Sequence, residues 1–506
     1  MRRMNDKQQV NQDSVASPLF DEFMTMASDG YNLIPVRRKI KLSGVTAESL
    51  LQGLRAEKRG FLLEGEAFGE ASGGRVVIGC DTLLRLQLFP TTAALMIGPS
   101  RRELSGKPLV VLQQALDKLR CPDQDKTSAV CGSLFGYLDY DAAATWERVR
   151  GVALAQDRLL GEWMLCRTLL FYDTAEQSAT IVSQTPVRKN RSAAIAYAAA
   201  NRHIETIAKR LTACREVCLN GEPAGFDAAQ NKQTRLQYTG NVSAAKQYIQ
   251  AGDAFQIVVS QMFSRPAGET QPLYRYRQLK KNNPSPYMFY FSAGESTLMG
   301  TSPEMLVRVT NGRAYSRPIA GTRRRGATAA EDNALAQSLL ADEKECAEHA
   351  MLVDLSRNDL GRIAAPGTVI VKDVMRVERF MRVMHMVSYV EADCEPETTA
   401  TDVLAACFPA GTVSGAPKAR AMEIIHELEQ DFRGPYAGAF GWLNANGDLD
   451  TCIVIRTAWQ EAGILHVRVG AGIVADSEPD KEYEEIQMKA SAVLAALEAK
   501  RNDSAD

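Results

Sequence analysis

The sequence predicts a mixed protein of strands and helices whose sheet is not built from parallel βαβ units. Short apolar runs rich in β-branched and aromatic residues, broken by glycine, are typical of strands and dominate the first third of the chain. Alanine-rich and amphipathic stretches with helical spacing lie between and after them. The sequence has no sustained βαβ rhythm and neither of the motifs GxGxxG and GxxxxGK(S/T), which argues against a nucleotide-binding fold.

The composition is that of an ordinary soluble protein and excludes several functions. The 506 residues hold 59 Lys and Arg against 61 Asp and Glu, a net charge of −2, so we expect no nucleic-acid partner, which would need a basic face. We expect neither a secretion signal nor a membrane span, because no apolar run reaches ~18 uncharged residues. Ten scattered cysteines without a CxxC pair indicate reduced thiols and a cytoplasmic location.

Periodicity and turn residues place the elements in order along the chain. Strands are expected at 60–64, 75–79, 132–138 and 168–172, with a helix at 108–119. A helix at 192–218 precedes the best linker, 219–240, which holds Asn-Gly and Pro-Ala-Gly. Ser243 can cap a helix that runs to Gly252, before a strand at 254–260. Further helices are expected at about 331–348, 399–407, 418–430 and 480–499.

This order divides the chain into four segments. A polar lead-in covers 1–30, a first domain covers 31–190, a helix and linker cover 191–240, and a second domain covers 241–500. Two large domains are compatible with the length.

Two pairs of glutamates are the strongest candidates for a metal site. Glu345 and Glu348 are three residues apart on one predicted helix, and Glu482 and Glu485 are three apart on the last, with Lys489 one turn further on. Residues three apart share a helix face, so two such faces could hold a hard cation such as Mg²⁺, which prefers oxygen ligands. A carboxyl group left over could act as a general acid. The alternative is that both faces are solvated.

Two segments rich in glycine and hydroxyl groups could hold a small polar ligand. At 318–323 (PIAGTR) an apolar run breaks into Gly321 and Thr322. At 411–418 (GTVSGAPK), which includes Thr412, backbone N–H groups are free just before a helix and could attract an anion. The alternatives are a strand end with its turn and an ordinary helix cap.

One arginine and one histidine complete the candidate site. Arg456 ends an apolar run, and together with the backbone of Gly470, Ala471 and Gly472 it could pair with a carboxylate. His385 lies between apolar residues and is either a base or a satisfied core residue. Together these clusters predict a small dianionic substrate, a divalent metal and a proton donor.

These residues stand in stretches that closely resemble the anthranilate synthase component I family of chorismate-utilising enzymes. The matching stretches run in order from residue 252 to residue 477 and read GDAFQIV, NPSPYMF, PIAGTR, HAMLVDLSRND, VMH, GTVSGAPK, DLDTCIVIR and GAGIVADS. The resemblance is strong over about 240–498 and weaker over 31–184.

The resemblance implies an α+β fold in which large antiparallel β-sheets pack as a sandwich with helices outside. It implies that 31–190 form a regulatory-type domain and that 241–500 form the chorismate-binding catalytic domain. It also implies a Mg²⁺-dependent lyase reaction that opens tryptophan biosynthesis. Ammonia adds at C2 of chorismate and the C4 hydroxyl leaves, which gives aminodeoxyisochorismate; loss of pyruvate then gives anthranilate. Family members take the ammonia from glutamine through a separate amidotransferase subunit, component II, and no stretch of this chain resembles one.

The resemblance also implies a role for each candidate residue. Glu345 matches the general acid, Glu348 and Glu485 match the carboxylates that bridge through Mg²⁺ to the ring carboxylate, and Glu482 lies behind them. His385 matches a residue linked to pyruvate elimination. The positions implied to contact chorismate are Gly321, Thr322, Thr412, Tyr436, Arg456, Gly470, Ala471, Gly472 and Lys489, with Thr412 also counted among the catalytic residues.

Two positions distinguish among the relatives. The isochorismate and salicylate synthases use water and carry a general-base Lys where this chain has Gln256, whereas ammonia needs no base. The aminodeoxychorismate synthases carry a nucleophilic Lys where this chain has Ala320. Both positions favour anthranilate formation. The alternatives are an aminodeoxyisochorismate, isochorismate or salicylate synthase, or a non-catalytic paralogue that binds the amidotransferase.

The sequence departs from the family at the site for the feedback inhibitor tryptophan. Members that bind tryptophan usually read LLES where this chain reads LLEG, so a hydroxyl group is missing at Gly65. The remaining positions of the inhibitor pocket, Pro286, Tyr287, Met288 and Cys452, still match. We therefore expect tryptophan to bind weakly or not at all.

Overall fold

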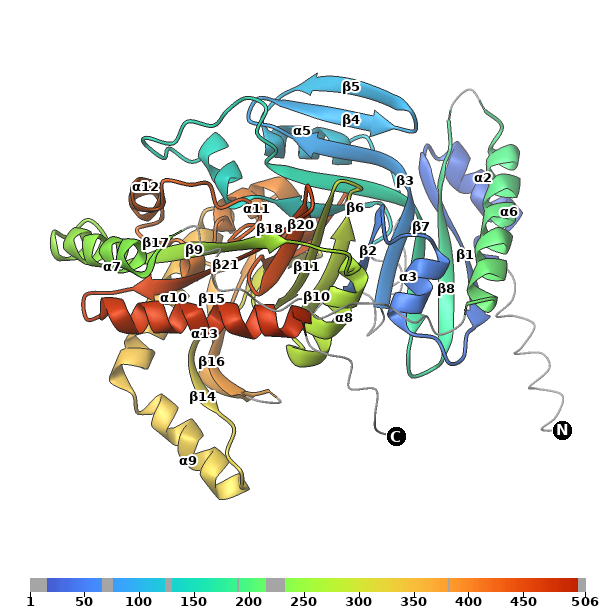
Figure 1. Ribbon diagram of the computed structural model, residues 1–506. Helices are drawn as coiled ribbons and strands as arrows, with labels where there is room; N and C mark the ends of the chain where they lie inside the picture. Colours follow the sequence, from blue (N-terminus) through green and yellow to red (C-terminus); the bar gives the residue numbers. More distant parts are fainter. Residues whose placement is uncertain are drawn as a thin grey trace.

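Two long antiparallel strands, β3 (Val76–Leu88) and β7 (Gly161–Asp173), organise the fold of the computed structural model (Figure 1). The structure describes residues 16–65, 76–122, 130–188, 191–214, 233–380 and 383–498. The register of the pair shifts between Thr82 and Leu84, next to Asp81 with its φ of 55°. This bulge bends the pair, so that each half of it belongs to a different layer of strands.

The first layer contains the N-terminal half of β3. It runs from β1 (Leu33–Lys41) through β8 (Ser178–Pro186), β7, β3, β2 (Gly60–Glu64), β10 (Tyr287–Ser292), β11 (Ser296–Ser302), β20 (Thr457–Glu461), β21 (Ile464–Ile473) and β9 (Gln256–Pro266) to β17 (Gly415–Ala416). Every pairing is antiparallel, so adjacent residues alternate between an inner and an outer face.

The second layer contains the C-terminal half of β3. It runs from β5 (Ser100–Ser105) through β4 (Thr92–Ile97), β3, β7, β6 (Ser133–Leu138), β18 (Ala439–Asn444), β19 (Leu449–Ile453), β12 (Met305–Thr310) and β13 (Arg313–Ser316) to β16 (Val383–Asp393). The other neighbours of β16 are β14 (Ile319–Arg324) and β15 (Ile370–Arg379).

Aromatic side chains join the inner faces of the two layers. The rings of Phe61 (β2) and Phe135 (β6) stack with centroids 4.1 Å apart, and those of Phe289 (β10) and Phe440 (β18) stack at 4.0 Å. All four side chains are fully buried in one hydrophobic cluster. The predicted α+β fold, a sandwich of antiparallel sheets, is confirmed.

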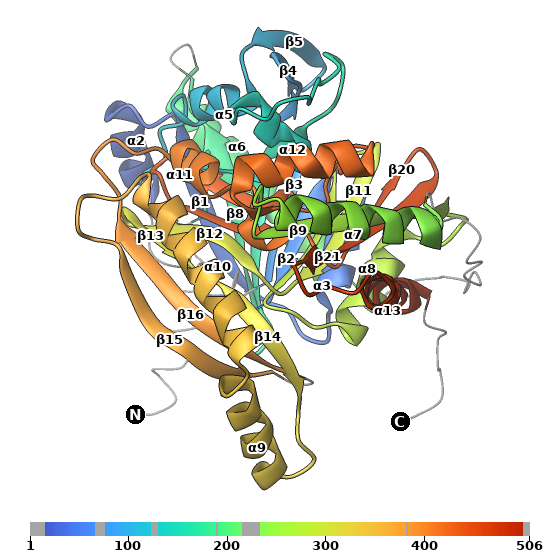
Figure 2. The same ribbon diagram turned by 90° about the vertical axis from the view of Figure 1, so that its left-hand side faces the viewer.

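Helices cover both outer faces, as expected. Apolar side chains of the first layer's outer face share a second core with the helices α2 (Phe20–Ser28), α3 (Ala47–Gly53), α6 (Ala193–Thr212), α7 (Arg235–Gln250), α8 (Pro272–Asn282), α12 (Lys418–Glu429) and α13 (Pro479–Glu498). The second layer carries α5 (Pro108–Leu116), α10 (Glu343–Gly361) and α11 (Ala400–Cys407). Short 3-10 turns are η1 (Tyr140–Thr145) and η3 (Gly411–Val413). Figure 2 shows α9 (Ala329–Leu340) projecting from the body beside the ends of β14, β15 and β16.

Most predicted elements are confirmed, and three of the differences have clear physical reasons. The helix expected from Ser243 begins at Arg235, because Thr234 and Gln237 form a reciprocal cap there. The single helix expected at 331–348 is two helices, because Asp342 caps a new one. The segment expected as a polar lead-in holds α2, whose buried Phe23 packs on the helix α6. Residues 1–15, the end of the expected helix at 215–218, and 219–232 of the expected linker lie outside the described residues.

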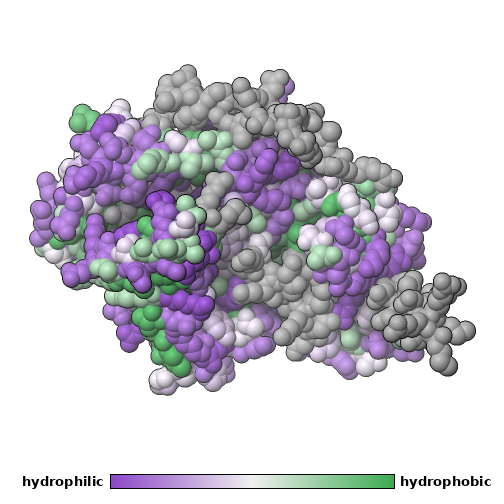
Figure 3. Space-filling view, turned by 90° about the horizontal axis from the view of Figure 1, so that it is seen from below, coloured by the Kyte–Doolittle hydropathy of each residue, from purple (hydrophilic) through white to green (hydrophobic). Residues whose placement is uncertain are grey.

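Strands from both predicted domains alternate in the same layers. β2 pairs with β10, and β6 pairs with β18, so hydrogen bonds join 31–190 to 241–500 in each layer. In the part of the chain that the structure describes, no helix is long and apolar enough to cross a membrane. Seen from below in Figure 3, the coloured surface is mostly hydrophilic, with hydrophobic residues in small separate groups.

Candidate active site

Glu345 and Glu348 lie on the first turns of α10. The N-cap residue of this helix, Asp342, also forms an ion pair with the neighbouring strand β14. The Asp342 carboxylate accepts hydrogen bonds from the backbone N–H groups of Lys344 and Glu345, at 3.1 and 3.2 Å. Arg323 of β14 donates to Asp342 at 2.8 Å and to Glu345 Oε1 at 3.0 Å. One arginine therefore holds both the start of the helix and the carboxylate predicted as general acid.

The last helix brings further carboxylates to the same place. Burial raises the pKa of Glu348, and the negative charges of Glu345 and Glu485 raise it further, so α10 and α13 present acidic side chains to each other. The Lys489 ammonium lies 2.6 Å from the Glu485 carboxylate and donates to the carbonyl oxygen of Gly470 at 3.1 Å. This lysine therefore ties the acidic face of α13 to β21.

These carboxylates fit a divalent cation through two ligands more readily than through three. Among the described residues, no group of three His, Cys, Asp or Glu side chains is close enough to hold an ion. Instead, Glu345 forms an ion pair with Arg323, and Glu485 forms an ion pair with Lys489. Burial and the charge of Glu485 nevertheless raise the pKa of both Glu348 and Glu482. A bound cation would compensate the negative charge of these carboxylates. Mg²⁺ commonly binds through one or two protein carboxylates together with substrate oxygens, so the set fits Mg²⁺.

A bulge in β14 places Gly321 and Thr322 against His385 of β16. Gly321 has a φ of 65°, and a Cβ atom there would lie 3.0 Å from Glu345 Oε2. His385 Nδ1 lies 3.1 Å from the Gly321 carbonyl oxygen and 3.0 Å from Thr322 Oγ1. Because a carbonyl oxygen only accepts, we assign the hydrogen to Nδ1, which leaves Nε2 as an acceptor. Burial lowers the pKa of His385, which favours the neutral ring.

Glu304 is a site residue that the sequence analysis missed. It stands in the short link between β11 and β12, and burial raises the pKa of its carboxyl group to about 7, although Thr412 and the Arg456 guanidinium act in the opposite direction. The buried Thr412 hydroxyl lies beside this carboxyl group, but the two do not meet at full hydrogen-bond geometry. The available signal was an acidic residue, in Ser302-Pro303-Glu304, between two apolar runs.

Arg456 connects Glu304 with His385. Its positive charge lowers the pKa of both groups, which places the guanidinium close to each of them. The Arg456 side chain is open to solvent, yet enough protein surrounds it that desolvation lowers its own pKa. A cation in the wall of a water-filled recess has both properties, so Arg456 is available to a carboxylate ligand.

The paired strands β9 and β21 bring Gln256, Gly470 and Gly472 to Tyr436. A Cβ atom at Gly470 would lie 2.7 Å from Tyr436 Oη, and one at Gly472 would lie 2.9 Å from Gln256 Nε2. The Gln256 Oε1 atom is buried and has no hydrogen-bond partner among the described residues. The Ala471 side chain points to the opposite face and packs in the core, so only its backbone can face a ligand.

These contacts arrange the predicted catalytic and chorismate-contacting residues around one site. Glu345 of α10 lies beside Gly321, and the carbonyl oxygen of Gly321 contacts His385. The Arg456 guanidinium lies close to both His385 and Glu304. The acidic face of α13 leads through Lys489 to Gly470 and Tyr436. Segments that are distant in sequence thus present acidic side chains, cationic side chains and backbone groups to the same region.

The residues predicted for tryptophan lie elsewhere, and two of the five are fully buried. A Cβ atom on Gly65, whose φ is 107°, would lie 2.2 Å from the Pro286 carbonyl oxygen, so a serine there requires the backbone to move. Tyr287 and Cys452 are buried between the layers. Met288 is half-buried and faces the other core, on the opposite side of β10.

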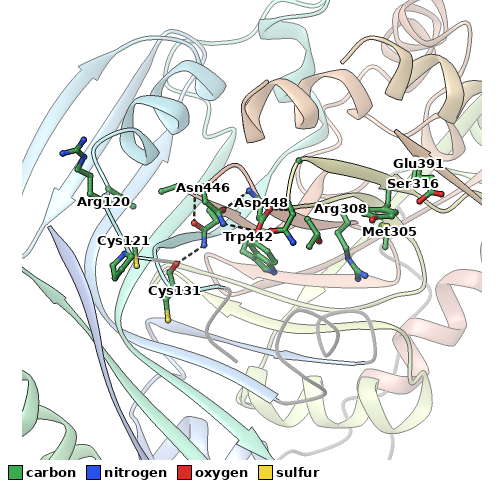
Figure 4. A pocket seen from close by; sticks show the side chains of 18 of the residues that line it. Arg120, Cys121, Cys131, Met305, Arg308, Ser316, Glu391, Trp442, Asn446 and Asp448 are labelled. Atoms are coloured by element: carbon green, nitrogen blue, oxygen red, sulfur yellow. Dashed lines mark hydrogen bonds between the residues drawn. The ribbon is translucent and has the colours of Figure 1, made fainter. Parts of the chain in front are cut away.

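A cavity of about 1300 Å³ lies apart from the carboxylates of the candidate active site (Figure 4). Trp442, Arg308 and Asp448 line it, and none of the predicted site residues does. Arg308 donates to Asp450 at 3.1 Å, and Tyr287 donates to the same carboxylate at 2.9 Å. The cavity therefore adjoins the region predicted for the inhibitor and not the candidate active site.

Comparisons with known proteins agree with this geometry. The profile of the chorismate binding enzyme family matches residues 84–495. Anthranilate synthase component 1 of Acetivibrio thermocellus is 40% identical over 490 residues, covering 95% of this chain and 98% of the relative. The protein of that name from Synechocystis sp. is 40% identical over 511 residues, covering 96% and 99%. A crystal structure of anthranilate synthase component I from Streptococcus pneumoniae superposes with a TM-score of 0.71 at 33% identity, covering 83% of this chain and 91% of that one.

The fold and the site define an enzyme that acts on chorismate. The chain belongs to the family of chorismate-binding enzymes. Within that family, it is similar over nearly its whole length to anthranilate synthase component 1. The menaquinone-specific isochorismate synthase of Escherichia coli has the same fold, with a TM-score of 0.66 at 19% identity.

Proposed function

We propose that the chain is the catalytic subunit of an anthranilate synthase, which converts chorismate and ammonia into anthranilate and pyruvate through aminodeoxyisochorismate. The names of its relatives support the reaction. The observation that carries the proposal is the half-buried Glu304, whose carboxyl group has a pKa raised by desolvation to about 7 beside the Arg456 guanidinium. It supplies a proton donor and a carboxylate-binding cation at the place where the family signatures converge.

The first step needs an acid, because hydroxide is a poor leaving group. A carboxyl group with a pKa of about 7 is half protonated at neutral pH, so Glu304 can donate a proton to the departing C4 hydroxyl group. Glu345, the acid implied by the resemblance, already accepts a hydrogen bond from Arg323 at 3.0 Å. We infer that Glu304 is the acid, and Glu345 stays the alternative.

Glu348 and Glu485 are the residues that would hold Mg²⁺, with Glu482 beside them. The ion, when bound, would neutralise the ring carboxylate of chorismate and draw electron density toward it. Glu348 and Glu485 come from different helices, so they fix the site only when α10 and α13 are both in place.

Arg456 and Tyr436 are suited to hold the enolpyruvyl carboxylate beside the backbone of 470–472. The guanidinium offers paired donors, and burial raises the pKa of Tyr436 to about 12, so its hydroxyl group remains a donor. In the second step, His385 Nε2 takes the proton from C2, the bond between C3 and the ether oxygen breaks, and pyruvate leaves as its enolate, which then takes up a proton at its methylene carbon. The ring then gains its aromatic electrons without any external oxidant.

Gln256 selects ammonia as the nucleophile. Its unpartnered Oε1 atom can accept an N–H of ammonia and orient the lone pair without removing a proton. Ala320 offers no competing nucleophile. We propose that the ammonia comes from glutamine through a partner amidotransferase subunit, as the designation component 1 of the relatives suggests. Six of the described cysteines are free thiols, which supports our placing the protein in the cytoplasm; they are Cys80, Cys166, Cys346, Cys394, Cys407 and Cys452.

Tryptophan, by this proposal, binds weakly or not at all. Gly65 supplies no hydroxyl group, and the contact with Pro286 blocks a simple restoration of serine. Titration of wild-type activity with tryptophan should show no half-inhibition in the micromolar range; such inhibition would refute this part of the proposal.

The reaction is tested with the purified full chain, chorismate, Mg²⁺ and ammonium at alkaline pH, with products separated by chromatography. We expect anthranilate and pyruvate in equal amounts. Isochorismate or salicylate would indicate that water is the nucleophile, accumulation of aminodeoxyisochorismate would limit the activity to the first step, and unconsumed chorismate would point to a non-catalytic protein.

A further inference from the structure

A buried ionic network lies beside the candidate site, on the face of β9 and β21 that also carries Gln256 and Gly470. Glu429, at the end of α12, is 4% exposed. Its carboxylate accepts hydrogen bonds from Arg433 at 2.6 Å and from Arg468 at 2.7 Å, and both arginines are at most 2% exposed. The backbone N–H and the hydroxyl group of Ser260 each donate to the same carboxylate at 2.8 Å. Every member of the network is therefore enclosed and out of reach of substrate.

Each arm of the network holds a segment that carries a site residue. Arg468 precedes Gly470 by two residues on β21, and Ser260 is the cross-strand partner of Gly470. Arg433 donates to the carbonyl oxygen of Val413, next to Thr412, at 2.6 Å.

Arg433 also reaches β9 and Tyr436. It donates to the carbonyl oxygen of Val258, two residues after Gln256, at 2.6 Å. Its guanidinium carbon lies 5.7 Å from the centroid of the Tyr436 ring. A cation over an aromatic face polarises the ring, which makes the phenol a stronger hydrogen-bond donor to an anion.

The network is not explained by stability alone. Buried ion pairs can often be replaced by apolar residues without loss of stability, whereas removing one member leaves an uncompensated charge. Here two arginines meet one glutamate, and the next acid, Asp431, lies 3.7 Å from Arg468 and is one-third exposed. The planar forks of Arg433 and Arg468 fix direction as well as distance, which suits a positioning role.

We propose that Glu429, Arg433 and Arg468 are positioning residues for the enolpyruvyl carboxylate of chorismate. They set the relative places of Tyr436, Gly470 and Thr412 without touching the substrate. The inference rests on the proposed function for the identity of the ligand, and it concerns binding, so it can fail or hold independently of which product forms.

The test compares Glu429→Gln with a matched control, Glu423→Gln. Glu423 lies on the same helix, is 5% exposed and also accepts from two arginines, Arg150 and Arg420. Neither of those arginines donates to a strand that faces the substrate. Binding of chorismate and of anthranilate to the full chain is measured by calorimetry without ammonia, and thermal unfolding is measured alongside.

We expect Glu429→Gln to weaken chorismate binding by about tenfold or more, the factor for one or two lost charge-assisted hydrogen bonds. Anthranilate lacks the enolpyruvyl group, so its affinity should change less than about twofold, the scatter expected for sites outside a coupled network. Glu429→Asp, which keeps the charge, should recover part of the chorismate affinity. Glu423→Gln should leave both affinities at the wild-type values.

Equal loss of affinity for both ligands, or no loss for either, would overturn the proposal, because a purely structural role does not distinguish them. If Glu429→Gln fails to fold, Arg468→Lys keeps the charge but removes the fork and should give the same ligand-selective loss. If Arg468→Lys shows no ligand-selective loss of affinity, the proposal is also overturned. A wild-type chain that binds chorismate but forms another product would refute the proposed function and leave this inference standing.

Discussion

Single residues decide the chemistry of this site through their surroundings more than through their type. Gln256, Arg456 and His385 could be proposed from sequence because their motifs are specific. Glu304 could not, because nothing in the sequence shows that a glutamate between two strands is partly enclosed beside a threonine and an arginine. Desolvation depends on the whole fold, and it raises the pKa of this carboxyl group, which is why we propose it as the proton donor.

Glu304 should give the activity a characteristic pH dependence. Its pKa rises from 4.5 to about 7 on folding, so the carboxyl group is protonated, and competent as an acid, below pH 7. We expect kcat/KM for chorismate, measured at a constant concentration of free ammonia, to fall as the pH rises through about 7. The free energy of unfolding should also decrease as the pH rises. The raised pKa of Glu304 stabilises the folded state fully below pH 4.5, and this contribution is lost as the pH rises through about 7.

Glu304→Gln should lower kcat/KM by about a hundredfold to ten-thousandfold, the usual range for a lost general acid. Steady-state kinetics would measure it, and the fall near pH 7 should disappear from the remaining activity. Full activity in the variant would return the acid role to Glu345.

At the scale of elements, capping and bulges place the acids where helical spacing alone could not. The 3-residue spacing correctly paired Glu345 with Glu348 on one helix, but it did not show that the helix begins at Asp342. The bulge at Gly321 that brings β14 to α10 was likewise recognisable only as a turn. Hydrophobic periodicity predicts which face of a helix or strand is buried, but it predicts the ends of the element poorly, because those ends depend on single hydrogen bonds.

Asp342→Ala should therefore affect the site more than a loss of helix stability explains. We expect a loss of about 0.5–2 kcal/mol from the cap, together with a clear drop in kcat, because Arg323 loses the partner that orients Glu345. Thr328→Ala, which removes the cap of the projecting helix α9, is the control. It should cost similar stability in urea unfolding and leave kcat unchanged; a comparable fall in kcat for both variants would contradict the account.

The helices α10 and α13 should also share the metal. Glu485→Gln removes one of the two carboxylates placed to bind Mg²⁺, so we expect the Mg²⁺ concentration for half-maximal activity to rise about tenfold or more. Titration of activity with Mg²⁺ measures this directly. Glu484→Gln, a neighbour on α13 whose side chain is exposed, should leave the Mg²⁺ requirement unchanged. An unaltered requirement in Glu485→Gln would remove that residue from the metal site.

At the scale of the whole molecule, the two predicted domains share one sandwich. The alternation of strands from both halves, with β2 on β10 and β6 on β18, was not predictable from sequence, because pairing between distant strands leaves no local pattern. The resemblance supplied the architecture, and the layers explain why the site lies among segments so far apart along the chain.

The shared core predicts cooperative unfolding. Phe440→Ala should cost about 3–5 kcal/mol, because the ring stacks on Phe289 between the layers. Urea unfolding followed by far-UV and near-UV circular dichroism should show one coincident transition. Two separate transitions, or a folded fragment comprising only 241–500, would show that the halves are independent.

The identity of the nucleophile is the most direct test of the central claim. The full chain is supplied with chorismate, Mg²⁺, ammonium carrying heavy nitrogen and water carrying heavy oxygen, and the aromatic product is weighed by mass spectrometry. We expect anthranilate that contains the heavy nitrogen and no heavy oxygen. A product hydroxylated with heavy oxygen at C2 would contradict it.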